Sequence, residues 1–557
     1  MKKKLTKTLA LLLAMMLCLS ACATPDNKET TKAPADKTTE AKPTDGQTEG
    51  GEQTTEAPTE APGITYPLEG NPTFTIWIQE RKQMTNQYPN YADSPFVKAW
   101  QEATGVTLKI EQFPNYKSMN LAFGSGELPD IILFHWTNYS GGITKAVKDK
   151  VVLPITDYME FAPDLAAVMA ADANARRANK TQDGEVIGFP TFASPDEKCG
   201  RTNGMIVRQE YLDQVKMEVP NTLDELYAVL KAFKDQLNVE APLSVNSSQL
   251  MYLLEHGMWT SPFGYVKSSE YAKDGKIKYG YYDDYAQFKE SVAFLKKLYD
   301  EKLLDNNFIT NPDVNANFMN GVTGMTFCAT ASGLNKILTT MEGDANFHLA
   351  AMPSITKNES DRAMSGYYAV SSGFYAVVTP ECKDIENAVK FLNYGYTDEG
   401  HMLMNFGVEG ESYTMVDGYP KYTELITNNP DGLNMQYALG PFVPMITPWA
   451  TAVQDVRYFD QYSGMPEQQA ALEVYMKDDA TDYFVHPTVR VADELLSEYN
   501  TLIGDINTYV KETVINCIAG KMTMEQFDKE FVSTLERMNI KRVIEIRQAA
   551  YDAWLAN

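Results

Sequence analysis

Strand-like and helix-like segments alternate along the chain between residues 74 and 134, and this order limits the possible folds most strongly. Phe74–Ile78 alternates apolar with polar residues, and so does Val106–Glu111. Between them, Ser94 followed by Pro95 is typical of a helix start, and Gly105 is typical of a helix end. These signals predict a strand, a helix and a second strand.

The same alternation continues to Phe134. A helix is expected over Tyr116–Phe123, and the short apolar run Ile131–Phe134 is typical of a strand buried on both faces. The order β-α-β-α-β predicts a parallel sheet with helices on both sides. Further strands are expected at Met205–Arg208 and Phe374–Val378, so the fold class is α/β.

The first residues have the features of an export signal. Lysines follow Met1, an apolar run extends from Leu9 to Leu19, and small residues precede Cys22. The run is shorter than the roughly 20 residues that cross a bilayer. Leu19-Ser20-Ala21-Cys22 resembles the lipobox of bacterial lipoproteins, which implies a signal peptide over residues 1–21 and a lipid (palmitate-bearing) anchor on Cys22. An ordinary signal peptide with an incidental cysteine is the alternative.

Residues 22–66 have the composition of a linker. Thr, Glu, Pro, Lys, Ala and Gly dominate this stretch, and it cannot bury enough apolar surface to offset the entropy of ordering it. As a flexible coil, about 44 residues span roughly 35–40 Å. We expect a spacer between the membrane surface and the folded body, with a glycosylated stalk as a minor alternative.

The charge balance excludes some partners. The chain has 49 Lys and Arg against 74 Asp and Glu, and its formal net charge is −25. Such a charge opposes binding to nucleic acid or to anionic lipid, so the lipid anchor is the only membrane contact expected. It also argues weakly against an acidic polysaccharide as ligand, since a local basic site can occur in an acidic protein.

The sequence has no recognisable catalytic or metal motif. Its 5 histidines show no His-x-x-x-His spacing, and there is no EF-hand loop, nucleophile elbow or phosphate-binding Gly-rich loop. The widely spaced Cys199, Cys328, Cys382 and Cys517 form no Cys-x-x-Cys pair. We therefore expect no cofactor and no metal. The paired carboxylates of a glycosidase are defined by their separation in space rather than in sequence, so the sequence leaves this kind of active site open.

Several short motifs together resemble a known family, the type-1 extracellular solute-binding proteins of ABC importers. They are Gly126-x-x-Pro129-Asp130, Asp183-Gly184-x-x-x-Gly188-x-Pro190, Phe318-x-x-Gly321-x-x-Gly324-Met325 and Thr397-Asp398-Glu399-Gly400. The last of these, with the residues after Asn405, looks like the lipid-anchored branch from Gram-positive bacteria. The resemblance implies a protein that acts as a monomer and carries a small-molecule ligand to the permease subunits of an importer.

The resemblance also implies a fold: a two-lobed periplasmic-binding-protein-like clamshell of type II, with strands that cross a hinge. We place lobe 1 at residues 67–190 and 370–440, and lobe 2 at 191–369 and 441–557. The crossings are expected near Thr191–Thr202, Ser365–Ser372 and Leu439–Thr447.

Candidate ligand-binding residues follow from what a sugar needs, namely flat apolar rings and groups that bind hydroxyls. Trp77, Trp136 and Asn138 come at strand ends, where ligands bind in open α/β sheets. The other candidates are loop or helix-end residues: Trp259, Asn335, Glu409, Glu411, Tyr413 and Trp449. For each tryptophan the alternative is a core position, and that is the expectation for Trp100 and Trp554, which lie on helical stripes.

Three functions remain open from the sequence. The first is a lipid-anchored protein that captures an oligosaccharide by lobe closure and delivers it to an ABC importer. The second is a surface-anchored glycosidase or lyase. The third is a peptide- or metabolite-binding receptor of the same fold.

Overall fold

The computed structural model describes residues 63–556, apart from 182, 197–198, 200–202, 312, 359–360, 362, 364–370, 447–449, 479–482 and 486–488. Contacts within the chain divide it into the units Met1–Glu60 and Ala61–Asn557, and the description below concerns the second unit. The predicted signal peptide, Cys22 and nearly all of the predicted linker lie outside the described residues.

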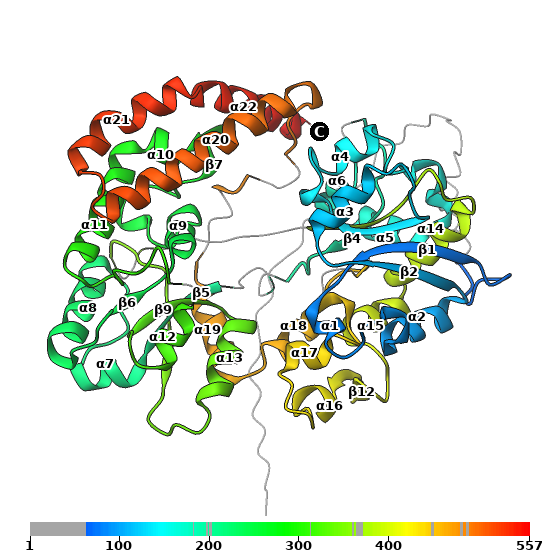
Figure 1. Cartoon of the computed structure of the whole chain (residues 1–557), viewed down its shortest axis with the longest axis horizontal. Coiled ribbons are helices and arrows are strands. Elements are labelled where there is room, and N and C mark those ends of the chain that lie inside the picture. Colours follow the sequence, from blue (N-terminus) through cyan, green and yellow to red (C-terminus); the bar gives the residue numbers. More distant parts are fainter. Residues whose placement is uncertain are drawn as a thin grey trace, which may run out of the picture. The chain divides into compact units, whose positions relative to one another are not determined.

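The first sheet is the predicted parallel one, enlarged by two strands. Its order is β2-β1-β3-β11-β4. Strand β1 pairs in parallel with β2 and with β3, and β11 runs antiparallel between β3 and β4 (Figure 1). The strands are β1 (Thr73–Gln79), β2 (Thr107–Phe113), β3 (Ile131–His135), β4 (Phe189–Phe192) and β11 (Ser371–Val378).

Both faces of this sheet are covered, as the apolar sequence of β3 predicts. Ile131 and Leu133 contribute to one hydrophobic cluster, whereas Ile132 and Phe134 contribute to another on the opposite face. The helices around the sheet are α1 (Lys82–Thr85), α2 (Pro95–Thr104), α3 (Tyr116–Phe123), α4 (Gly142–Lys148), α5 (Pro163–Ala171), α6 (Ala173–Ala178), α14 (Ile385–Asn393), α15 (Asp398–Phe406), α16 (Glu424–Thr427), α17 (Met435–Leu439) and α18 (Val456–Tyr462), with the hairpin β12 (Tyr413–Val416) and β13 (Tyr419–Tyr422). We call this part the first lobe.

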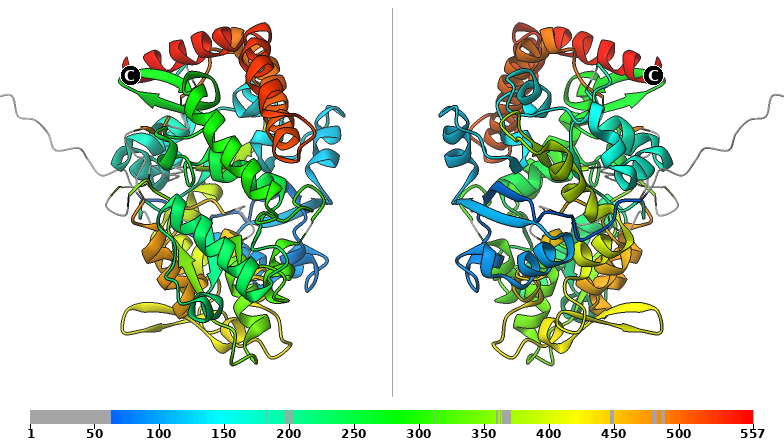
Figure 2. Two further views of the ribbon diagram at one scale, coloured as in Figure 1. Left: turned by 90° about the vertical axis from the view of Figure 1, so that its left-hand side faces the viewer. Right: turned by 90° about the vertical axis from the view of Figure 1, so that its right-hand side faces the viewer.

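The second lobe has its own sheet and its own core. The sheet order is β10-β5-β9-β6, with β5 (Asn203–Arg208), β6 (Leu243–Ser244), β9 (Met325–Ala329) and β10 (Leu349–Met352). Its helices are α7 (Gln209–Val215), α8 (Leu223–Leu237), α9 (Ser247–Glu255), α10 (Gly280–Asp283), α11 (Tyr285–Asp300), α12 (Val314–Met319), α13 (Ser332–Met341), α19 (Pro466–Tyr475), α20 (Asp493–Ile518), α21 (Met524–Arg537) and α22 (Ile540–Ala556), beside the hairpin β7 (Glu270–Lys273) and β8 (Lys276–Tyr279). The two cores give the two-lobed α/β fold that the sequence predicts, and α20 to α22 gather at one end of the second lobe (Figures 1 and 2).

Local sequence signals place the helix ends correctly. The Ser94 hydroxyl accepts a hydrogen bond from the Val97 N–H at the start of α2, and Gly105 ends this helix with φ 70°. At the start of α8, Thr222 and Glu225 form the expected capping box. These interactions involve residues within four positions of one another, which is why the sequence alone reveals them.

The third crossing lies later in the chain than predicted. We expected it near Leu439–Thr447, but Phe442, Val443 and Phe459 belong to the core of the first lobe, and α18 packs against β13. Helix α19 packs against β10 of the second lobe, so the chain passes between the lobes after Tyr462. The apolar side chains that follow residue 440 complete the first core, which the sequence pattern could not assign to either lobe.

The beginning of the described chain also packs on the first lobe. Tyr66, the last residue of the predicted linker, makes an edge-to-face contact with Tyr394 at 5.0 Å between ring centroids. Its hydroxyl donates a hydrogen bond of 2.6 Å to the Lys390 carbonyl. The folded part therefore includes residues from the end of that linker.

Gly204 allows α19 to approach β5 closely, and this contact can be tested. A Cβ at Gly204 would lie 2.0 Å from the Tyr475 Cζ atom, and Tyr475 is buried with its hydroxyl bonded to the Met205 carbonyl. We expect Gly204→Ala to lower the free energy of unfolding by about 1–3 kcal/mol through overpacking, as measured by chemical denaturation.

Gly504→Ala is the matched control for that substitution. Gly504 is exposed in α20, and a Cβ there meets nothing within 4 Å. Because alanine favours the helix, this variant should be about 0.5–1 kcal/mol more stable than the wild type. A Gly204→Ala protein as stable as the wild type would contradict the close packing of α19 on β5.

Candidate ligand-binding site between the lobes

Two chain segments pair where they leave the first lobe. The Phe192 N–H donates to the Ala452 carbonyl at 3.0 Å, and the Gln454 N–H donates to the Phe192 carbonyl at 2.9 Å. The Thr191 hydroxyl also donates to the Ala450 carbonyl. The first segment continues toward β5, and the second continues through α18 toward α19. Backbone pairing therefore ties together two segments of the first lobe that each lead to the second lobe.

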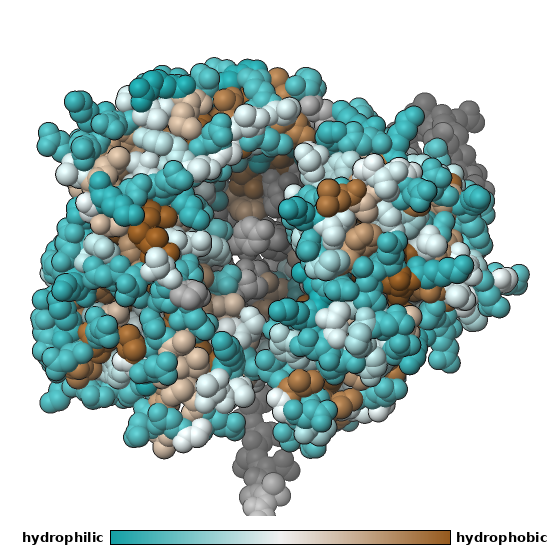
Figure 3. Space-filling model, viewed as in Figure 1, coloured by the Kyte–Doolittle hydropathy of each residue, from teal (hydrophilic) through white to brown (hydrophobic). Residues whose placement is uncertain are grey.

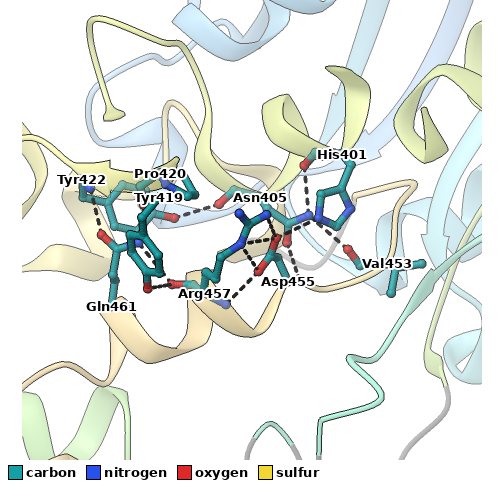
Figure 4. A network of polar contacts seen from close by, with 9 residues as sticks. All are labelled: His401, Asn405, Tyr419, Pro420, Tyr422, Val453, Asp455, Arg457 and Gln461. Carbon is teal, nitrogen blue, oxygen red and sulfur yellow. Dashed lines mark hydrogen bonds and ion pairs between the residues drawn. The ribbon is translucent and has the colours of Figure 1, made fainter. Parts of the chain in front are cut away.

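A polar network anchors the second of these segments to the first lobe (Figure 4). The Asn405 side chain of α15 donates to the Val453 carbonyl at 3.0 Å and accepts from the Asp455 N–H at 2.9 Å. The Asp455 carboxylate accepts from His401 Nε2 at 2.9 Å and from Arg457 Nη2 at 2.6 Å. It also accepts from the Arg457 N–H at 2.7 Å, which caps α18.

The network stabilises the charged form of Asp455. Burial of the carboxyl group raises its pKa, but hydrogen bonds from His401 and from Arg457 lower it by more. The pKa of Asp455 therefore lies well below the usual range for aspartate. Since Asp455 is only 7% exposed, loss of its charge would leave the partner groups without their acceptor.

A pocket of about 590 Å³ lies between α6 of the first lobe and the segment 490–495 and helix α22 of the second. This volume falls within the range of about 300–1,000 Å³ that is usual for ligand sites. Figure 3 shows the viewed face hollowed between the two lobes, and Figure 1 shows α22 reaching toward α6. The pocket is thus lined by both lobes.

The two walls of the pocket differ in chemistry. Arg176, Arg177 and Lys180 come from the end of α6 and the residues after it, and Arg490 comes from the second lobe. The opposite wall is apolar, built mainly from alanines together with Leu495, Ile546 and the half-buried Trp554. No acidic side chain lines the described part of this pocket.

Contacts across the pocket hold the basic groups in place. Arg490 donates to the Lys180 carbonyl and, at 2.8 Å, to the Ala178 carbonyl, so a second-lobe side chain caps the end of α6. The Arg177 guanidinium lies over the Trp554 ring, with Cζ at 4.8 Å from the ring centroid. Both contacts join the lobes across the pocket.

The structure buries Trp77 and Trp136 rather than presenting them to a ligand. Trp77 is 7% exposed and packs against Phe113, and Trp136 is 1% exposed with its Nε1 donating to the Tyr375 carbonyl at 3.1 Å. Side chains from α3 and its surroundings cover both rings, so these residues have the core position that the sequence analysis kept as the alternative.

Two other aromatic candidates are also core residues, and one lies outside the described part. Trp259 is 2% exposed in the second core, and Tyr413 is 5% exposed against Phe406. Trp449 falls within the undescribed residues 447–449. Sequence context indicates a loop at Trp259 correctly, but a loop residue can still point into the core.

The polar candidates are scattered, and none of them lines the pocket described here. Asn138 is exposed and donates to the His135 carbonyl at 3.1 Å. Asn335 is half-buried on α13 and contacts Met465 Sδ at 3.5 Å. Glu409 and Glu411 are both exposed beside the β12–β13 hairpin.

Sequence reasoning did not identify the residues that the pocket brings together. Trp554 was expected in a core because it lies on a helical stripe, but it is half-buried and faces Arg177. The only signal was the run of basic residues Arg176, Arg177 and Lys180 in an acidic chain. Nothing in the sequence indicates that this run lies beside the end of α22.

The described residues show neither a metal centre nor a membrane span. They contain no cluster of three or more His, Cys, Asp or Glu side chains arranged to hold a metal ion. No helix within residues 63–556, as far as they are described, is long and apolar enough to cross a bilayer. The thiols of Cys199, Cys328, Cys382 and Cys517 are free.

Comparisons with a family model, with curated proteins and with solved structures agree with one another. The family model described as bacterial extracellular solute-binding protein matches residues 85–402. The lipoprotein LipO of Bacillus subtilis is 24% identical over 460 residues, which covers 78% of this chain and 84% of LipO. The fructooligosaccharide ABC transporter substrate-binding protein FusA of Streptococcus pneumoniae is 22% identical and covers 89% of this chain and 93% of its own. The crystal structure of the alginate-binding protein AlgQ2 superposes with a TM-score of 0.69 at 19% identity, over 88% of this chain and 99% of that one.

The Asp455 network gives a prediction about pH. We expect Asp455→Asn to lower the free energy of unfolding at pH 7 by about 1–3 kcal/mol, because it removes the charge of a buried carboxylate that binds His401 and the partly exposed Arg457. The pKa of this carboxyl group is depressed in the folded protein, so its contribution is complete above the unfolded value of about 3.9 and is lost as the pH falls below it. Denaturant titrations from pH 7 to pH 3 should show the difference from wild type narrowing below about pH 4.

Asp528→Asn serves as the control for that experiment. Asp528 pairs with Lys289 at 2.9 Å on the exposed surface, where such pairs contribute little. Its loss should have a smaller effect than the loss of Asp455 at pH 7. An Asp455→Asn variant that differs from wild type equally at pH 7 and pH 3 would contradict the role of the ionised carboxylate.

Proposed function

Because the chain belongs to the family of bacterial extracellular solute-binding proteins, we propose that it captures a carbohydrate between its two lobes and delivers it to an ABC importer. The observation that carries this proposal is a pocket lined by both lobes, in a chain whose segments at Phe192 and Val453 pair before each leads to the second lobe. Such a connection permits a hinge motion while each sheet stays intact. An oligosaccharide is the ligand class that we favour.

The names of similar proteins support the binding of a carbohydrate rather than its enzymatic cleavage. FusA is named for fructooligosaccharide and for an ABC transporter, and it matches most of this chain. The family and FusA are named for binding, not for an enzymatic activity. The alternative of an anchored glycosidase or lyase therefore has no support from them.

Capture by closure requires that the ligand bind the closed form better than the open form. The geometry of the pocket supports such a mechanism, since a molecule in it would touch α6 and α22 at once. Separation of the lobes would remove one wall. The ligand would therefore stabilise the closed arrangement through contacts that the open arrangement does not offer.

Lipid anchoring at Cys22 is part of the proposal. The lipobox-like Leu19-Ser20-Ala21-Cys22 and the linker composition of residues 22–66 support it, and LipO is named as a lipoprotein. The anchor would hold a monomer near the permease subunits at the outer face of the cell membrane. No contact of the folded part with the bilayer is needed.

A ligand panel tests the carbohydrate proposal. Neutral and acidic oligosaccharides, peptides and small metabolites are added to the folded protein, and its Tm is measured. At 100 times its Kd a ligand adds about 2.7 kcal/mol of stability, which should raise Tm by roughly 2–3 °C for a folded body of this size. At least one oligosaccharide should do so and should also reduce the radius of gyration in solution scattering. A rise with peptides or metabolites alone would overturn the proposal.

The anchor is tested separately with a cysteine substitution. In a Gram-positive host, the wild type should incorporate labelled palmitate and remain with the membrane fraction. Cys22→Ser should lose the label and be released into the medium, because the acceptor thiol is missing. Cys18→Ser keeps the expected acceptor and should behave as the wild type does. Release of the wild-type protein without label would refute lipid anchoring.

A further inference from the structure

The pocket between α6 and α22 has a positive wall in a strongly acidic protein. The chain as a whole has a formal net charge of −25, yet the charged side chains lining the described pocket are Arg176, Arg177, Lys180 and Arg490. Asp183 and Glu185 are near in sequence but are exposed and do not line it. Because charges in solution are screened beyond about 8 Å at physiological salt, this local cluster rather than the net charge sets the potential in the pocket.

Capping of α6 explains the position of one of the four basic side chains that line the pocket, but not of all four. A cation at a helix end is often there to satisfy the last carbonyl groups. Arg490 does this for α6, with hydrogen bonds to the carbonyls of Ala178 and Lys180. The Lys180 side chain lies beyond the end of α6, and the Arg177 guanidinium is held over Trp554. Arg177 and Lys180 thus add positive charge that capping does not require.

The basic wall is held by a chain of contacts that reaches into the second lobe. Arg547 of α22 donates to the Val489 carbonyl at 2.5 Å and pairs with Glu270 Oε1 at 2.6 Å. Val489 directly precedes Arg490, so the Glu270–Arg547 pair fixes the segment that carries the capping arginine. On the other side, stacking on Trp554 restricts Arg177. A site organised in this way loses little entropy when an anion binds.

The opposite wall selects against a simple inorganic anion. Leu495, Ile546 and the surrounding alanines present an apolar surface within the same pocket of about 590 Å³. A small hydrated anion would leave most of this volume and surface unused. A sugar ring with a carboxylate offers C–H groups to the apolar wall and two oxygens to the arginine, in a geometry suited to guanidinium.

We propose that this pocket binds the carboxylate of an acidic sugar, with Arg177 and Lys180 contacting the carboxylate and the α22 wall contacting the ring. The inference rests on the proposed function and specifies its ligand class, uronic-acid oligosaccharides. It revises the expectation from overall charge, which argued weakly against an acidic polysaccharide. Since Arg177 and Lys180 belong to the first lobe and the apolar wall to the second, the acidic sugar also bridges the lobes.

Calorimetric titration with a matched pair of ligands tests this proposal. The probes are trigalacturonate and its fully methyl-esterified form, which has nearly the same shape without the charge. The wild-type protein should bind trigalacturonate at least tenfold more tightly than the ester, and the affinity should fall as the salt concentration rises from about 20 to 150 mM.

Substitutions in the protein complete the test. Arg177→Gln and Lys180→Gln should each weaken trigalacturonate binding about tenfold and leave binding of the ester unchanged. Lys98→Gln removes the same charge from the exposed face of α2 and should have no effect on either ligand. The Tm of each variant without ligand, compared with that of the wild type, checks that the fold is intact.

The possible outcomes separate this inference from the proposed function. Equal binding of acid and ester, with both variants like wild type, overturns the acidic-sugar site and leaves carbohydrate binding intact. Binding of neutral oligosaccharides alone would likewise overturn the acidic-sugar site while leaving the proposed carbohydrate binding intact. Inorganic phosphate that binds as tightly as trigalacturonate, with the same dependence on Arg177 and Lys180, overturns the sugar assignment. If no oligosaccharide of any kind binds, the proposed function fails and this inference fails with it.

Discussion

The backbone pairing of Phe192 with residues 452–454 is the interaction on which the arrangement of the lobes depends. It joins two first-lobe segments that come from distant parts of the sequence and that each lead to the second lobe. The Asp455 carboxylate then fixes one of them to α15 through His401, and it also binds Arg457 of the following helix α18 (Figure 4). A buried charge with several donors is well suited to such a position, since it tolerates only one geometry.

The fold could be predicted from the sequence where its causes are local. The alternation from Phe74 to Phe134, the Ser94 cap and the Thr222–Glu225 capping box depend on residues close together in the chain, and the structure confirms them. The crossing after Tyr462 was predicted too early. An apolar residue such as Phe442 can complete either of two cores, and only the tertiary structure determines which.

The site was less predictable for the same reason. Trp77, Trp136 and Trp259 have the chemistry of sugar-binding residues, but large aromatic side chains serve equally well in a core, and there the structure places them. The pocket instead combines a basic run at the end of α6 with a tryptophan near the end of α22, and Arg490 completes it. Overall charge pointed away from such a site. A net charge sums over the whole surface, whereas binding depends on the few groups within one Debye length.

The position of β11 within the first sheet has a consequence for how the chain matures. β11 is inserted between β3 and β4, and β4 has no other partner in the sheet. While the polypeptide is emerging, β3 therefore has an open edge and β4 stays unpaired until residues 371–378 have been made, after most of the second lobe. Open strand edges favour association with other chains. A chain that stops before β11 would therefore keep the edge of β3 exposed and leave β4 without its partner, and such a fragment would tend to aggregate rather than fold as a separate lobe.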